Sequence, residues 1–221
     1  MNLVDRFKEI RSSLPLNVKI VAVSKTKPAS KIELLYRETG QRDFGENRVL
    51  ELDAKHEILS ADINWHFIGH LQSNKVKNIV PYVSLIQSVD SLKLIHEINK
   101  EGIRNNRVIS CLLQFHIATE EAKYGFSFDE VVRMFDENIF DKLSNISIKG
   151  VMGMATNTSD RKQIRTEFKT LFSYFNSIKY KYFAQEPDFR EISMGMTDDY
   201  QIAIEEGSTI VRIGSGIFGK D

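Results

Sequence analysis

The chain has 221 residues, with 30 Lys and Arg residues against 30 Asp and Glu residues, so its formal net charge is zero. This balance argues against nucleic acid or an anionic membrane as a partner, because proteins that bind either normally carry a basic excess. The single cysteine, Cys111, excludes an internal disulfide and a cysteine-rich metal site, and it fits a reducing compartment. The N-terminus carries charges among its apolar residues, and no apolar run approaches the ~18 residues that span a bilayer. We therefore expect a cytoplasmic protein without a membrane partner.

The chain opens with an amphipathic pattern over residues 2–13, in which apolar residues at helical spacing alternate with charges before Pro15. Beyond it, short apolar runs typical of strands alternate with segments of helical periodicity. The eight apolar runs lie at 18–24, around Phe44, and at 65–69, 83–89, 108–117, 148–154, 190–196 and 209–214. The helical segments between them lie at 30–39, 46–59, 72–79, 91–100, 128–136, 162–180 and 198–205.

This alternation predicts an α/β fold with a parallel sheet, whose strands are joined by right-handed helical crossovers. Eight such units in 221 residues favour a closed (β/α)8 TIM barrel over an open doubly wound sheet, and the GxGxxG fingerprint of the open sheet is absent. No linker, repeat or low-complexity tract marks a boundary. The sequence therefore predicts one barrel domain over residues 1–221, with an extra helix at its N-terminus.

Polar residues at strand ends are the candidates for chemistry, because the carboxyl ends of all eight strands of such a barrel meet in one bowl. The first run is followed by Ser24-Lys25-Thr26-Lys27, and we expect Lys25 at a buried mouth and Lys27 in solvent. Burial disfavours a charged lysine, so the pKa of Lys25 would fall and its amine could form a Schiff base. The alternative for Lys25 is an ordinary solvated lysine just past a strand.

The second and third apolar runs also end in polar residues. The second ends in FGEN at 44–47, where a glycine permits a turn that would aim the amide of Asn47 inward. The alternative is that Asn47 caps the following helix. The third run carries His66 and His70, but a strand alternates its side chains and no third ligand is near, so we expect no metal.

The loops after the seventh and eighth runs, SMGMTDD at 193–199 and RIGSG at 212–216, combine glycines with hydroxyl groups. Barrels of this kind often hold phosphate there, because glycine lets the backbone approach and hydroxyls can donate. The candidate phosphate ligands are Ser193, Gly214 and Ser215, although tight turns would have the same composition. Arg212 interrupts an apolar strand, and a buried arginine requires an acceptor. A Schiff-base lysine, a phosphate cradle and an inward arginine facing one bowl describe a site for pyridoxal 5′-phosphate (PLP).

At these residues the sequence resembles the pyridoxal phosphate homeostasis proteins, barrel relatives of alanine racemase (PLP fold type III). The blocks that carry the resemblance are VAVSKTKP at 21–28, FGEN at 44–47, WHFIGHLQSNK at 65–75, SMGMTDD at 193–199 and VRIGSGIFG at 211–219. The resemblance implies that Lys25 is the internal-aldimine lysine and that Arg212 is the partner of the ring nitrogen. The phosphate ligands that it implies are Ser193, Gly214 and Ser215. Gly216 departs from the Ala or Thr that is usual at its position.

The resemblance further implies a non-catalytic carrier or regulator of PLP in the homeostasis of vitamin B6 and amino acids. PLP-dependent apoenzymes would be its recipients, and we expect a monomer. Arg212 can only donate, so the ring nitrogen beside it must stay unprotonated, which weakens the ring as an electron sink. Lys123 is a weaker candidate for a secondary attachment site.

Two other functions stay open on the sequence. The first is a PLP-dependent amino-acid racemase of low activity, for which His66 and His70 are the nearest candidates for a second base. It is disfavoured because no residues remain for the additional β-domain that supplies a racemase with that base. The second is a Schiff-base aldolase that would use Lys25 and the phosphate cradle on a sugar phosphate without a cofactor.

Overall fold

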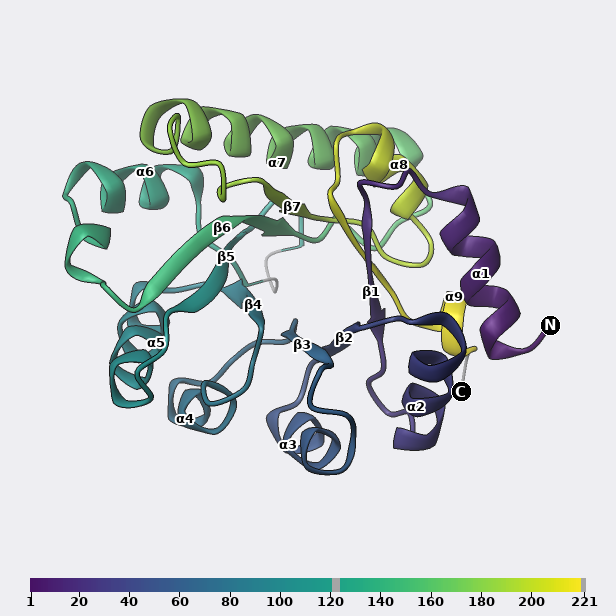
Figure 1. The fold of residues 1–221 in the computed structure, drawn as a ribbon. Helices are drawn as coiled ribbons and strands as arrows, with labels where there is room; N and C mark the ends of the chain where they lie inside the picture. Colours follow the sequence, from purple (N-terminus) through teal and green to yellow (C-terminus); the bar gives the residue numbers. More distant parts are fainter. Residues whose placement is uncertain (121–123, 220–221) are drawn as a thin grey trace.

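In the computed structural model, which describes residues 1–120 and 124–219, eight parallel strands close into a barrel (Figure 1). The strands are β1 (Lys19–Val23), β2 (Asp43–Glu46), β3 (Asn64–Phe67), β4 (Leu85–Val89), β5 (Ile109–Phe115), β6 (Ile146–Gly153), β7 (Glu191–Ser193) and β8 (Ile210–Ile213). Each strand pairs with its neighbours in sequence, and β8 pairs in parallel with β1 to close the sheet. Every predicted apolar run contains or overlaps one strand, and the (β/α)8 barrel is confirmed.

The helices pack around the outside of the barrel (Figure 1). They are α1 (Leu3–Ser13), α2 (Ala29–Thr39), α3 (Val49–Ile58), α4 (Val76–Ile79), α5 (Leu92–Arg104), α6 (Phe128–Asp136), α7 (Arg161–Tyr182), α8 (Tyr200–Glu205) and α9 (Ser215–Phe218), with short 3-10 turns at Ser73–Lys75 and Phe140–Lys142. The predicted N-terminal helix is present as α1, which packs against α2 and α9. The sequence did not predict α9, because its glycine-rich segment is too short to show an apolar period.

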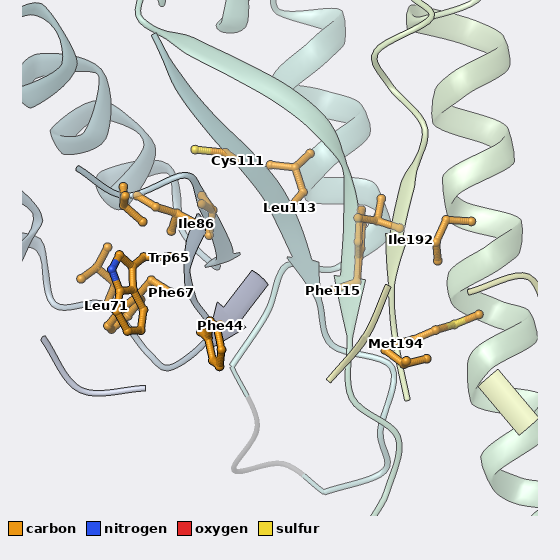
Figure 2. Close-up of a cluster of buried hydrophobic side chains, with 14 of the residues drawn as sticks. Phe44, Trp65, Phe67, Leu71, Ile86, Cys111, Leu113, Phe115, Ile192 and Met194 are labelled. Atoms are coloured by element: carbon orange, nitrogen blue, oxygen red, sulfur yellow. The ribbon is translucent and has the colours of Figure 1, made fainter. Parts of the chain in front are cut away.

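Most apolar side chains are buried between the outer face of the barrel and the helices. Figure 2 shows part of this cluster, including Trp65 of β3 and Phe115 of β5. Cys111 lies in the same layer as a free, buried thiol, and burial raises the pKa of this thiol. Across the described parts of the chain, no helix combines the length and the apolar character of a membrane span.

A second, smaller apolar cluster fills part of the barrel interior and consists of Val21, Leu85, Leu112, Met152 and Ile210. Side chains alternate between the two faces of a strand, so the residues at i and i+2 share one face. On β4 this rule puts Gln87 on the same face as Leu85, and on β8 it puts Arg212 on the same face as Ile210. The interior of the barrel is therefore apolar in one part and polar in another.

Candidate functional site

A cleft of about 490 Å³ opens at the carboxyl ends of the strands. The predicted site residues that line it are Lys25, Asn47, Arg212, Gly214 and Ser215. They come from the loops after β1 and β2 and from β8 and the turn that follows it. Closure of the barrel therefore brings together residues that are nearly 190 positions apart in the sequence.

Lys25 lies two residues beyond the end of β1, and its side chain is exposed rather than buried. The backbone turns at Thr26, which has a φ of 64°, so Lys25 stands on the rim of the cleft. Lys27, which we expected in solvent, is buried instead. Its Nζ donates to the carbonyl oxygen of Gly219 at 3.3 Å. The sequence therefore assigned the burial of these two lysines the wrong way round.

A buried ionic cluster holds the loop that carries Lys25. The carboxylate of Glu46, on β2, accepts from the Ser24 hydroxyl at 2.5 Å and from Lys55 Nζ at 2.7 Å. Lys55 also donates to the carbonyl oxygen of Ser24 and to Glu51, and Glu51 accepts the Thr26 N–H at 2.6 Å. Burial raises the pKa of Glu46, against the lowering effect of its bonds to Lys55 and Ser24. The cluster therefore holds the loop at Ser24 and at Thr26, the two neighbours of Lys25 in the chain.

Asn47 follows β2 directly and presents an unsatisfied acceptor. Its Oδ1 is buried and has no hydrogen-bond partner among the residues that the structure describes. The following helix, α3, has Arg48 at its N-cap position, so the alternative reading of Asn47 as a helix cap is wrong. A Cβ at Gly69 would collide with the Asn47 carbonyl oxygen, so this close approach requires glycine. A buried acceptor beside a cleft is a natural partner for a donor on a ligand.

Arg212 reaches the cleft from inside the barrel, and only 3% of its surface is exposed. Its Nη1 donates to Ser193 Oγ at 2.6 Å, and its Nη2 donates to the Gly153 carbonyl oxygen at 3.1 Å. Burial lowers the pKa of Arg212 to about 10, although the charge of Asp199 acts to raise it. The guanidinium is therefore protonated at neutral pH, and its remaining N–H groups are available to a ligand in the cleft.

Ser193 is fully buried beneath Arg212 and is not among the described residues that line the cleft. Its hydroxyl accepts from Arg212 and donates to Gln87 Oε1 at 2.6 Å. Thr197, four residues later, does line the cleft, and its Oγ1 accepts the N–H of Gly216 at 3.3 Å. The phosphate role of Ser193 stays a prediction. Thr197, the second hydroxyl of the same SMGMTDD block, was not predicted from the sequence.

The two histidines of the third block lie in different places. His70 lines the cleft, where its Nδ1 is 2.8 Å from Asp90 Oδ2 and its ring stacks on Tyr124 with 3.9 Å between centroids. His66 lies inside the barrel, 2.9 Å from a carboxylate oxygen of Asp43. Within the described ranges, no three metal-binding side chains form a group. Lys123, the secondary attachment candidate, falls outside the described residues.

Fold and site define the chain as a (β/α)8 barrel protein with a polar ligand cleft at the carboxyl ends of its strands. The family model of the alanine racemase N-terminal domain matches residues 1–221. The pyridoxal phosphate homeostasis protein of Aquifex aeolicus is 36% identical over 203 residues, which cover 91% of this chain and 86% of that protein. The homologue of the same name from Synechocystis sp. is 36% identical over 218 residues, or 96% of each chain.

The structure of PipY from Synechococcus elongatus PCC7942 without PLP matches with a TM-score of 0.90 at 32% identity, covering 99% of this chain and all of PipY. The structure of PipY with PLP bound matches with a TM-score of 0.86 at 30% identity and the same coverage. The chain therefore belongs to the alanine racemase N-terminal domain family and, within it, to the pyridoxal phosphate homeostasis proteins.

Proposed function

We propose that the chain binds PLP in the cleft and acts as a PLP carrier or regulator rather than as an enzyme of substantial turnover. The observation that carries this proposal is the meeting of an exposed lysine amine, a protonated arginine and the unpartnered Oδ1 of Asn47 around one cleft. The names of the relatives and the PLP-bound form of PipY support it.

The donor set of the cleft fits PLP at each of its polar groups. The Lys25 amine would condense with the aldehyde and release water, and Arg212 would donate to the ring nitrogen. The Asn47 Oδ1 would accept a hydrogen bond from the bound molecule. The hydroxyls of Thr197 and Ser215, with the backbone at Gly214, would hold the phosphate. When bound, PLP supplies an electrophilic aldehyde and an aromatic ring that can accept electron density.

Two features favour a carrier. Lys25 is exposed on the rim, so an incoming amine can reach the bond between Lys25 and the cofactor. Arg212 can only donate, so it keeps the ring nitrogen as an acceptor without a proton and limits carbanion chemistry. We infer a monomer over residues 1–221 that hands PLP to apoenzymes in the cytoplasm; these points stay predictions.

One observation favours the second candidate, a PLP-dependent amino-acid racemase of low activity. His70 lines the cleft, and its Nδ1 is hydrogen-bonded to the carboxylate of Asp90. A hydrogen bond of this kind orients a histidine that acts as a general acid or base. His66, the other candidate base, faces away from the cleft and is bonded to Asp43 inside the barrel. A racemase would therefore depend on His70.

A titration of the apo chain with PLP tests the proposed function. With one equivalent of PLP, wild type should shift the near-visible absorption of free PLP to longer wavelength, as expected when the aldehyde becomes an imine, and Lys25→Ala should leave the spectrum of free PLP unchanged. Lys31→Ala is the matched control, because Lys31 is an exposed lysine of α2 that does not line the cleft in the described structure. An equal shift in Lys25→Ala, or no shift in wild type, would refute the proposal.

A further inference from the structure

A continuous chain of hydrogen bonds runs through the barrel from Arg212 at the cleft to Asp43 at the amino end of β2. Arg212 Nη1 is 2.6 Å from Ser193 Oγ, which is 2.6 Å from Gln87 Oε1. Gln87 Nε2 is 2.9 Å from His66 Nδ1, and His66 Nε2 is 2.9 Å from Asp43 Oδ1. We call these five residues the relay; they come from β8, β7, β4, β3 and β2.

Every hydrogen bond of the relay points the same way. Arg212 can only donate a hydrogen bond, and Ser193 accepts it. The Ser193 hydroxyl in turn donates a hydrogen bond to the carbonyl oxygen of the Gln87 amide. The NH2 group of Gln87 then faces His66 Nδ1, which must be the unprotonated acceptor. His66 Nε2 therefore carries the ring proton and donates a hydrogen bond to the carboxylate of Asp43. The relay therefore begins at a cation, ends at an anion and selects one neutral tautomer of His66.

The relay is almost completely shielded from water. Its first four members are at most 3% exposed, and only the side chain of Asp43, which is 20% exposed, approaches solvent. Asp43 and His66 line a cavity of about 250 Å³ that also includes Lys19 and Asn64. A buried polar chain is costly unless every member is satisfied, and a satisfied chain holds its members in fixed orientations.

The relay orients the guanidinium of Arg212. Within the barrel this guanidinium donates to two acceptors, the hydroxyl of Ser193 and the carbonyl oxygen of Gly153. We propose that Gln87 and His66 are positioning residues, which hold Ser193 and thereby aim the guanidinium of Arg212 into the cleft. Neither Gln87 nor His66 is among the described residues that line the cleft. The inference rests on the proposed function only in assigning the ring nitrogen of PLP as the acceptor that Arg212 meets there.

The first test interrupts the middle of the relay with Gln87→Met, which keeps the shape of the side chain and removes its amide. We expect PLP to bind ~3- to 10-fold more weakly than to wild type, which is the range for the loss of one hydrogen bond between neutral groups. Asn99→Leu is the matched control: Asn99 is another buried amide, which accepts the N–H of Asn145 far from the relay. Equal PLP affinity in Gln87→Met and wild type, or an equal loss in Asn99→Leu, would overturn the inference.

The second test uses the apo chain and so does not depend on PLP binding. Nitrogen-15 NMR of wild type should show His66 as the neutral tautomer protonated at Nε2. Ser193→Ala frees the Gln87 amide to rotate. The nitrogen-15 chemical shifts of the two His66 ring nitrogens should then move toward the values of a mixture of tautomers. Ser193→Thr keeps the hydroxyl and should restore the wild-type His66 signals, while His70 should be unchanged in both variants. A proton on Nδ1 in wild type, or identical His66 signals in Ser193→Ala, would overturn the relay.

Discussion

Nη1 of Arg212 donates a hydrogen bond to Oγ of Ser193 at 2.6 Å. From the sequence we expect these two residues at opposite ends of PLP, Arg212 at the ring nitrogen and Ser193 at the phosphate, yet in the folded chain they are in contact. The only hydroxyl proton of Ser193 is directed to Gln87, so a bond from Ser193 to phosphate would require that contact to break. The hydroxyl that faces the Gly214-Ser215 turn belongs to Thr197.

Replacement of Thr197 by valine therefore tests the phosphate end of the cleft. Valine keeps the shape of threonine and removes its hydroxyl, so PLP should bind at least ~10-fold more weakly, as for the loss of a hydrogen bond to a charged group. Pyridoxal, which lacks the phosphate, should bind Thr197→Val as well as it binds wild type. Ser215→Asp, which brings a negative charge to the same turn, should weaken PLP binding more strongly than Ser215→Asn. An equal loss for PLP and pyridoxal in Thr197→Val would show that Thr197 does not face the phosphate.

Asp43 makes the stability of the chain depend on pH. Burial acts to raise the pKa of Asp43, but the hydrogen bonds from His66 and Asn64 and the positive charge around the carboxylate together outweigh it, so the pKa lies below its usual value of 3.8. Because the folded state favours the carboxylate, Asp43 stabilises the fold above pH 3.8, and this contribution is lost as the pH falls through the lowered pKa.

Urea unfolding of Asp43→Asn measures that contribution. At pH 7 the free energy of unfolding should fall by about 1.5–3 kcal/mol, as for the loss of a hydrogen bond to a charged group. The difference from wild type should shrink as the pH is lowered below 3.8. Asp188→Asn, a change in the same cavity at an exposed carboxylate paired with Lys149, should have a much smaller effect. A constant difference at all pH values would contradict the role of the Asp43 charge.

Incubation of the PLP-loaded chain with L-alanine in deuterated water separates a carrier from a racemase. We expect turnover far below the ~1–10³ s⁻¹ that is typical of enzymes, because racemisation needs a proton carrier on each face of the bound amino acid and the proposed function assigns only Lys25. Chiral analysis and mass spectrometry measure D-alanine and deuterium at Cα. Rapid formation of deuterated D-alanine, lost in both Lys25→Ala and His70→Asn, would establish the racemase.

Local patterns were enough to predict the barrel, because each strand is an apolar run and each crossover has a helical period. They failed where burial depends on distant partners. Lys27 is buried because the carbonyl oxygen of Gly219 lies beside it, and Lys25 is exposed because the chain turns at Thr26. The partners of His66 are 21 and 23 residues away on other strands, so they meet only when the barrel closes.

The departure at Gly216 also gains a physical account from the structure. A Cβ at Gly216 would lie 3.1 Å from Ile213 Cγ2 and 3.2 Å from Thr197 Cγ2, which is tighter than an ordinary contact. The glycine therefore fits the close approach of Thr197 to the turn after β8. Its neighbours are 19 and three residues away, and their spacing could not be read from the sequence.

Borohydride reduction of the PLP-loaded chain tests whether Lys25 is the lysine that binds the cofactor. Hydride adds to the carbon–nitrogen double bond between the cofactor and its lysine, and the resulting secondary amine survives digestion and peptide mapping. We predict that the peptide containing Lys25 carries the added mass of the pyridoxyl group, and that Lys25→Ala loses the stable labelling. Labelling mainly on Lys27, Lys123 or any other lysine, with Lys25 unmodified, would contradict it.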